Sequence, residues 1–184
     1  MNKNNEISKR SRLLAAASDI VNNKGVSQLT LEAVANQAGV SKGGLLYHFP
    51  NKEALIKAMV DELSEVYMND MQKNLQTFKG EGQWSKAYVK TMFAEVEDGL
   101  KISSALLAAI FTKPELLERT QAEYKEIQEK IENDQVDPVQ ATIARLAADG
   151  LWFAEMFGFA PLDKKMRDQV FNELTKLITK GDES

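Results

Sequence analysis

Few side chains in this sequence could catalyse a reaction or hold a metal. The chain has no cysteine and one histidine, His48, among its 184 residues. Disulfides, thiolate zinc sites, cysteine nucleophiles and multi-histidine metal sites are therefore excluded. A Ser-His-Asp arrangement would have to use His48, and no serine or carboxylate motif accompanies it. We expect no catalytic site, no metal site, no cofactor and no enzymatic activity.

Positive charge is concentrated near the N-terminus. Residues 1–55 carry seven Lys and Arg against four Asp and Glu, although the whole chain has a net charge of −4. A basic segment on an acidic protein indicates a polyanionic partner at that end. From charge alone, chance clustering is an equal alternative.

The composition is typical of a soluble globular protein, with 43% hydrophobic and 27% charged residues. There is no apolar run of about 18 residues that would indicate a transmembrane helix. The polar N-terminus also lacks the apolar stretch of a signal peptide. We expect a cytoplasmic protein with no membrane partner.

Apolar residues recur at three- and four-residue spacing along almost the whole chain, which predicts an all-α fold of about nine helices. Gly25, Gly39 and Pro50 separate the first helices, and two glycines in residues 79–83 indicate a loop. The final helix has Met166, Val170, Leu174, Leu177 and Ile178 on its expected inner face. The expected helices cover about residues 7–21, 31–38, 42–49, 51–78, 84–98, 102–111, 114–132, 139–157 and 164–178.

Residues 29–52, LTLEAVANQAGVSKGGLLYHFPNK, predict a helix-turn-helix. Ala35 and Ala38 are small enough for two helices to cross closely. Gly39 permits the backbone angle of the turn, and Val40 can fill the space between the helices. Ser41 can cap the second helix, which would fit a DNA major groove.

Here the sequence resembles the TetR/AcrR family of bacterial transcriptional regulators. The resemblance covers about residues 8–58: a first helix ending in NNKG, then the run LTLEAVANQAGVSKGGLLYHFPNKEAL. It implies a three-helix DNA-binding domain over residues 1–52 and a helical effector-binding and dimerisation domain over residues 53–184. It further implies a homodimer that binds a palindromic operator as a repressor and is released by a small lipophilic or aromatic effector.

The resemblance also assigns DNA contacts position by position. It makes the second helix of the motif the recognition helix, whose first residues, Lys42, Gly43 and Gly44, lie nearest the base edges. Leu46 could contact a thymine methyl group or, alternatively, pack against the protein's own core. Gly43 and Gly44 have no side chains where base contacts are expected, so we infer that close backbone approach and DNA shape carry much of the specificity. His48 could instead be a plain surface histidine, Lys42 and Lys52 ordinary solvated lysines, and Tyr47 a core aromatic. Phe49 is expected in the core. The expected DNA-binding residues are Arg10 and Arg12 (backbone or minor groove), Thr30, Tyr47, His48 and Lys52 (phosphates), and Ser41, Lys42, Gly43, Gly44 and Leu46 (the recognition helix).

Eleven of the fourteen aromatic residues lie from Phe78 onward. Within the family resemblance they predict an aromatic effector pocket between helices, with ordinary core packing as the alternative. Acidic residues on the same helices (Glu95, Asp98, Asp149 and Glu155) could meet a cationic ligand. The expected pocket residues are Trp84, Tyr88, Met92, Phe93, Phe111, Tyr124, Trp152 and Met156.

The last two long helices carry apolar strips with small residues, which predicts a two-fold four-helix bundle between subunits. The alternative is that these strips pack onto their own domain. The expected interface residues are Ile143, Leu146, Ala147, Gly150, Ala154, Phe157, Val170, Leu174 and Leu177.

The expected mechanism is a two-state switch. An effector bound between helices of residues 84–160 would shift the long helix 51–78 and move the recognition helices out of register. A protein-interaction adaptor is the main alternative function, and an all-α enzyme is a weaker one.

Overall fold

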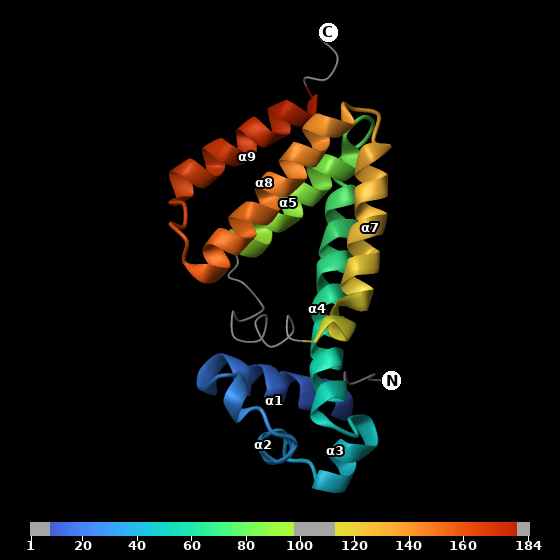
Figure 1. Cartoon of the computed structure of the whole chain (residues 1–184), viewed down its shortest axis with the longest axis vertical. Helices are drawn as coiled ribbons and strands as arrows, with labels where there is room; N and C mark the ends of the chain where they lie inside the picture. The colour runs from blue at the N-terminus through green and yellow to red at the C-terminus, as the bar shows by residue number, and fades with distance from the viewer. Residues whose placement is uncertain (1–7, 98–112, 180–184) are drawn as a thin grey trace, which may run out of the picture. The chain divides into compact units, whose positions relative to one another are not determined.

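A computed structural model describes residues 8–97 and 113–179, and within those residues every regular element is a helix (Figure 1). This confirms the expected all-α class. The expected helix at residues 102–111 lies outside the described part of the chain. The eight described α-helices and two 3-10 helices are α1 (Lys9–Lys24), η1 (Val26–Gln28), α2 (Leu31–Ala38), α3 (Lys42–His48), α4 (Lys52–Leu75), α5 (Gln83–Glu97), η2 (Pro114–Leu117), α7 (Glu118–Glu132), α8 (Pro138–Phe157) and α9 (Lys164–Thr179).

Short polar side chains begin five of these helices, including Ser41, which the sequence predicts as a cap. Each accepts a hydrogen bond from a main-chain N–H three residues later, one of the groups that a helix start leaves without a partner. The acceptors are Thr30 before α2 (3.1 Å), Ser41 before α3 (3.2 Å), Asn51 before α4 (2.7 Å), Asp137 before α8 (2.8 Å) and Asp163 before α9 (2.7 Å).

Three local expectations were wrong. Residues 114–117 form a 3-10 turn rather than the start of α7, with the Leu116 N–H donating to the carbonyl oxygen of Lys113 at 3.0 Å. The sequence favours Gly25 as a left-handed residue that ends the first helix, but it has a φ of 83° and a ψ of 161°, outside the left-handed helical region. Met166, expected inside, is 48% exposed. Residues four apart on a helix are offset by about 40°, so the buried face around Leu174 and Ile178 has rotated away from it.

The contacts divide the chain into two compact units, and α4 crosses from one to the other between Leu63 and Ser64. The domain boundary expected at residues 52 and 53 is a functional division and stays a prediction. In the first unit, α1 packs against α2 and η1, and α2 packs against α3. Its core includes Leu13, Leu14, Ile20, Val34, Leu45, Phe49 and Leu55, together with Leu116 of η2.

In the second unit, α5 packs against α7, α8 and α9, and α8 also packs against both α7 and α9 (Figure 1). The side chain of Ser64 on α4 donates a hydrogen bond to Glu123 on α7. This unit's core includes Met71, Tyr88, Met92, Ile127, Ile131, Ala144 and Ile178. None of the helices in the described residues is long and apolar enough to cross a membrane.

The start of α5 is capped by a residue far away in sequence. The carboxylate of Asp134, only 6% exposed, accepts hydrogen bonds from the main-chain N–H groups of Trp84 (3.1 Å) and Ser85 (2.7 Å). It also accepts one from the Ser85 hydroxyl at 2.8 Å. Negative charge at a helix N-terminus is favourable because the unpaired N–H groups there are partly positive. The loop between α7 and α8 is thereby fixed to α5.

Candidate functional site

The helix-turn-helix predicted from residues 29–52 is formed by α2, a turn at Gly39 and α3. Gly39 has φ 64° and ψ 37°, the left-handed conformation that favours glycine. Its neighbour Val40 packs against the core of the first unit. Both roles expected for this turn are confirmed.

The recognition helix α3 buries one side and exposes the other. Leu45 is fully buried, whereas Lys42 and Gly43 are exposed and Leu46 is 37% exposed. Tyr47 is 86% exposed, an unusual environment for a large aromatic side chain in a folded protein. The exposed side of α3 is therefore available to a partner.

The three aromatic rings at the end of α3 have different environments. Phe49 is 2% exposed and belongs to the core, as the sequence predicts. The ring of His48 is half-buried and lies 5.2 Å, edge to face, from the ring of Tyr47. Contact of Tyr47 or His48 with phosphates remains a prediction.

Gly43 and Gly44 differ in the space around them. A Cβ atom on Gly44 would lie 2.9 Å from Cγ1 of Val40 and 3.2 Å from the hydroxyl oxygen of Ser41. A Cβ atom on Gly43 would meet nothing within 4 Å. Packing therefore explains the absence of a side chain at Gly44, but nothing within the described chain explains it at Gly43.

The two arginines of α1 make contacts inside the first unit. The Nη2 atom of Arg12 donates a hydrogen bond of 2.7 Å to the main-chain oxygen of Ala38, the last residue of α2. The guanidinium carbon of Arg10 lies 5.8 Å from the centre of the Phe49 ring. Arg12 therefore braces the turn of the motif, a role the sequence did not reveal. Their expected DNA contacts stay predictions.

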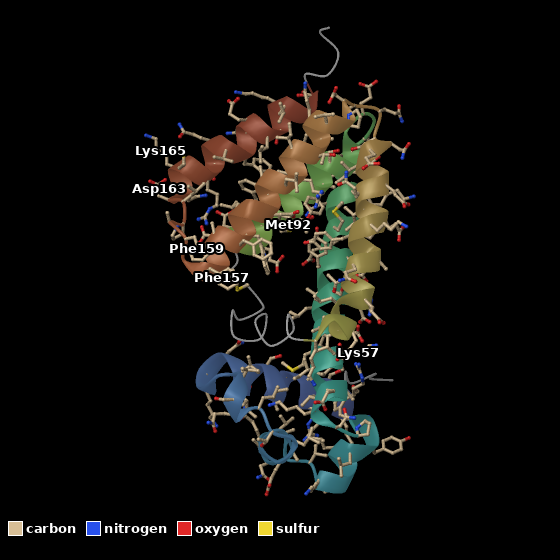
Figure 2. All side chains as sticks on the ribbon, in the orientation of Figure 1. Lys57, Met92, Phe157, Phe159, Asp163 and Lys165 are labelled. Atoms are coloured by element: carbon tan, nitrogen blue, oxygen red, sulfur yellow. The ribbon has the colours of Figure 1, made fainter. Side chains whose placement is uncertain are left out.

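The other expected phosphate ligands lie at helix starts. Thr30 is exposed while its hydroxyl caps α2. Lys52, the first residue of α4, is half-buried, and the exposed Lys57 follows on the same helix (Figure 2). Lys57 was not among the expected contacts.

Two family descriptions match this chain. Residues 13–59 match "Bacterial regulatory proteins, tetR family", and residues 82–179 match "Tetracyclin repressor-like, C-terminal domain". The second match alone spans more than half of the chain. The protein belongs to the TetR family.

Individual relatives agree with the family assignment. The HTH-type transcriptional regulator RutR of Escherichia coli is 40% identical over 60 residues, 33% of this chain and 28% of RutR. The chain thus matches well under two thirds of the length of the first curated relatives. A family of regulators agrees with the expectation that the chain is not an enzyme.

The fold also agrees with solved structures. A TetR-family member, SCO1917 of Streptomyces coelicolor, superimposes with a TM-score of 0.68 at 21% identity, covering 93% of this chain and 98% of that one. The multidrug binding protein EbrR, solved with imidazole, gives 0.67 at 21% identity over 93% and 95%.

In the second unit of this TetR-family protein, the expected pocket residues lie in several separate environments. Tyr88 and Tyr124 belong to one polar cluster, whereas the ring of Phe93 packs 5.3 Å from Phe171 of α9. The ring of Trp84 lies 5.7 Å below the Lys130 amine. Met92 is buried, Trp152 and Met156 are half-buried, and Phe111 lies outside the described residues.

The polar cluster contains Tyr67 of α4 and Arg145 of α8, which the sequence reasoning missed. The Tyr88 hydroxyl donates a hydrogen bond to Asp149 of α8. Burial raises the pKa of the Asp149 carboxyl, while the hydrogen bond from Tyr88 and the charge of Arg145 act in the opposite direction. Burial is also the main reason why the pKa values of Tyr67, Tyr88 and Tyr124 are raised. All three tyrosines are therefore neutral hydroxyls at neutral pH.

One side of α8 is apolar and exposed. Ile143 is 49% exposed, Leu146 54% and Phe157 39%, and Gly150 lies between them. Two further exposed residues on this helix, Val139 (65%) and Phe153 (42%), were not predicted. Of the other expected interface residues, Ala147, Ala154, Val170 and Leu177 are half-buried, and Leu174 is 8% exposed in the core of its own unit.

The aromatic side chains at the end of α8 form a continuous stack. The rings of Phe153 and Phe157 are nearly parallel, with 6.3 Å between centroids, and Phe159 lies 5.6 Å beyond Phe157. Figure 2 shows Phe157 and Phe159 at the C-terminal end of α8 and in the turn after it. Phe159 is 71% exposed. Side chains this apolar and this exposed indicate an interaction surface.

Proposed function

We propose that this protein is a ligand-responsive DNA-binding transcriptional regulator that represses by binding a palindromic operator as a homodimer. The observation that carries the proposal is the exposed side of α3. The ring of Tyr47 is 86% exposed and Lys42 is also exposed, so both side chains of α3 are free to contact a partner. In a helix-turn-helix, this side of the second helix is the one that enters the major groove.

The homodimer part of the proposal is supported by the exposed apolar side of α8. Successive members of the set Val139, Ile143, Leu146, Phe153 and Phe157 are four, three, seven and four residues apart, so they share one side of a 20-residue helix. A two-fold axis would place this strip against its own copy and bury both. Two recognition helices held about one DNA turn apart then bind far more tightly than one.

The switch part of the proposal is supported by the chain's connectivity. α4 runs without interruption from the first unit into the second. The turn η2 buries Leu116 in the core of the first unit, and α7 of the second unit begins directly after it. An effector that prefers one arrangement of the second unit could act on the helix-turn-helix through these two connections. A coupling of about 1–3 kcal/mol is typical of such switches.

The effector is expected to be a small, aromatic or lipophilic molecule held in the second unit. EbrR, which shares the fold, is described as a multidrug binding protein, and aromatic side chains are abundant in this chain's second half. The domain division at residues 52 and 53 is part of the same proposal, with DNA contacts before it and effector and dimer contacts after it.

The test is binding of the full-length protein to double-stranded DNA from upstream of its own gene, measured by fluorescence anisotropy at several salt concentrations. We expect salt-dependent binding, with two protomers per site, that Tyr47→Ala weakens at least tenfold. A folded protein that binds no duplex DNA at any salt concentration would refute the proposal. Binding of a protein partner through α3 instead would support the adaptor alternative.

A further inference from the structure

A cluster of polar side chains from four helices lies inside the second unit. α4 contributes Tyr67, α5 contributes Tyr88, α7 contributes Tyr124, and α8 contributes Arg145 and Asp149. The rings of Tyr67 and Tyr88 lie edge to face, 6.4 Å apart. Tyr67 and Tyr124 both lie close enough to Tyr88 to influence its pKa. So many polar groups in one apolar unit are unfavourable unless each has a hydrogen-bond partner.

The carboxylate of this cluster already has its partners. One oxygen of Asp149 accepts the hydrogen bond from Tyr88, and the other accepts one of 2.7 Å from Nη1 of Arg145. The side chains of Arg145 and Asp149 are only 17% and 15% exposed, so their charges offset each other in a poorly solvated place. Arg145 therefore already supplies a positive charge beside this carboxylate, and a contact of Asp149 with a cationic ligand stays a prediction.

Five buried polar atoms on these helices lack a partner among the residues that the structure describes. Two are the amide oxygens of Gln128 on α7 and Gln140 on α8, and the other three are the hydroxyl oxygen of Tyr67, the Nε of Arg145 and the indole nitrogen of Trp152. The two nitrogens can only donate hydrogen bonds, and a tyrosine hydroxyl can donate one. Arg145, Asp149 and Trp152 are four and three residues apart on α8, so they share one side of that helix. Gln140 is five residues before Arg145 and lies on another side of α8. On the side that Arg145 and Trp152 share, the atoms without a partner are donors, and a hydrogen-bond acceptor would satisfy them.

We propose that the effector is a small aromatic molecule bearing a carboxylate or carbonyl oxygen, which accepts hydrogen bonds from Tyr67, Arg145 and Trp152. This rests on the proposed function, because it names the chemistry of the effector that the regulator would sense. The aromatic part would lie among the tyrosine rings, and the oxygen would receive the donors. An organic cation would place its charge beside Arg145 and would leave the donors unused.

A matched set of probes tests this chemistry: benzoate, benzamide and benzamidine share one ring and differ in charge and in acceptor oxygens. Binding is measured on the full-length protein without DNA, by thermal shift and by the fluorescence of Trp152 in a Trp84→Phe background, which leaves one tryptophan. We expect benzoate and benzamide to bind at least tenfold more tightly than benzamidine. Equal or tighter binding of benzamidine, or no binding of any probe, would overturn the proposal.

The variant Tyr67→Phe separates a ligand contact from a structural role. Because the Tyr67 hydroxyl has no described partner to lose, the unliganded variant should melt no lower than the parent protein. Its affinity for benzoate should fall at least tenfold. The control Thr175→Val removes a hydroxyl that donates to the Phe171 carbonyl at 2.9 Å on α9, and benzoate binding should not change. Unchanged benzoate affinity in Tyr67→Phe would overturn the proposal.

A separate arm keeps this test independent of the regulator function. Anisotropy with labelled operator DNA, with and without benzoate, is run on the same protein samples. Absence of DNA binding without benzoate would refute the proposed function and leave the probe results standing. DNA binding together with a preference for benzamidine would refute only the chemistry proposed for the effector.

Discussion

The adjacent glycines of the recognition helix allow folding and DNA contact to be separated by two single substitutions. Both Gly43 and Gly44 lie in the first half of α3, so replacing either with alanine changes intrinsic helix propensity by the same amount, about 1 kcal/mol in favour of alanine. Only at Gly44 does the new methyl group meet other atoms. The difference in stability between the two variants therefore isolates the steric term.

The size of that term follows from the distances. The added carbon at Gly44 would lie 2.9 Å from Cγ1 of Val40, whereas carbon atoms prefer separations of about 3.5–4.0 Å. Val40 is β-branched and packed against the core, so it cannot easily move aside. Overpacking of this kind typically destabilises by about 1–3 kcal/mol. Gly43→Ala should melt about 2–4 °C above the parent protein, and Gly44→Ala at least about 2 °C below Gly43→Ala.

Alanine at Gly43 should raise the stability of the protein but weaken its binding to DNA. If the backbone of α3 approaches the bases closely there, Gly43→Ala is more stable than the parent protein but binds DNA about tenfold or more weakly, about 1.4 kcal/mol. Calorimetry measures the melting temperatures, and anisotropy with upstream DNA measures affinity. If Gly44→Ala is as stable as Gly43→Ala, the steric argument is wrong. Parent-like DNA affinity in Gly43→Ala would refute close backbone approach.

Three further sets of substitutions test other parts of the structure. Lys52→Ala should weaken binding to all duplexes alike. It should also lower the slope of log affinity against log salt concentration by about 1.8, since a dimer loses two phosphate contacts. Lys42→Ala should in addition change the sequence preference, and equal effects of both variants would contradict these roles. Asp134→Ala removes the distant cap of α5 and should lower the free energy of unfolding by about 3 kcal/mol in urea titrations. Asp134→Asn should have an intermediate effect. A loss below about 0.5 kcal/mol in Asp134→Ala would count against the cap. Leu146→Glu should produce monomers in sedimentation experiments and weaken DNA binding. The control Lys125→Glu, at an exposed side chain on α7, should remain dimeric.

Much of the fold could be predicted because its signals are local. A capping side chain acts on an N–H three residues away, so Thr30, Ser41 and Asp137 mark helix starts in the sequence itself. Gly39 needs only its own φ to end α2. The helix-turn-helix was recognisable for the same reason, since its glycine, small residues and caps lie within one short segment.

The candidate sites were only partly predictable, because exposure and pairing depend on the whole unit. The sequence could not distinguish Gly43 from Gly44, since the clash of Gly44 depends on the position of Val40. It assigned Leu174 to a partner surface, whereas the packing of α9 places that side chain in its own core. It also missed Val139 and Phe153, whose exposure depends on which side of α8 packs against α5, α7 and α9.

The sequence by itself determined the all-helical class, the helix starts and the helix-turn-helix, because each depends on interactions within a few residues. Only the tertiary structure decided which distant polar groups meet. Arg12 reaches Ala38 across 26 positions, Asp134 caps Ser85 across 49, and Asp149 accepts from Tyr88 across 61. Hydrogen bonds act over about 3 Å, so no spacing in the sequence could reveal these pairs before packing brought their helices together.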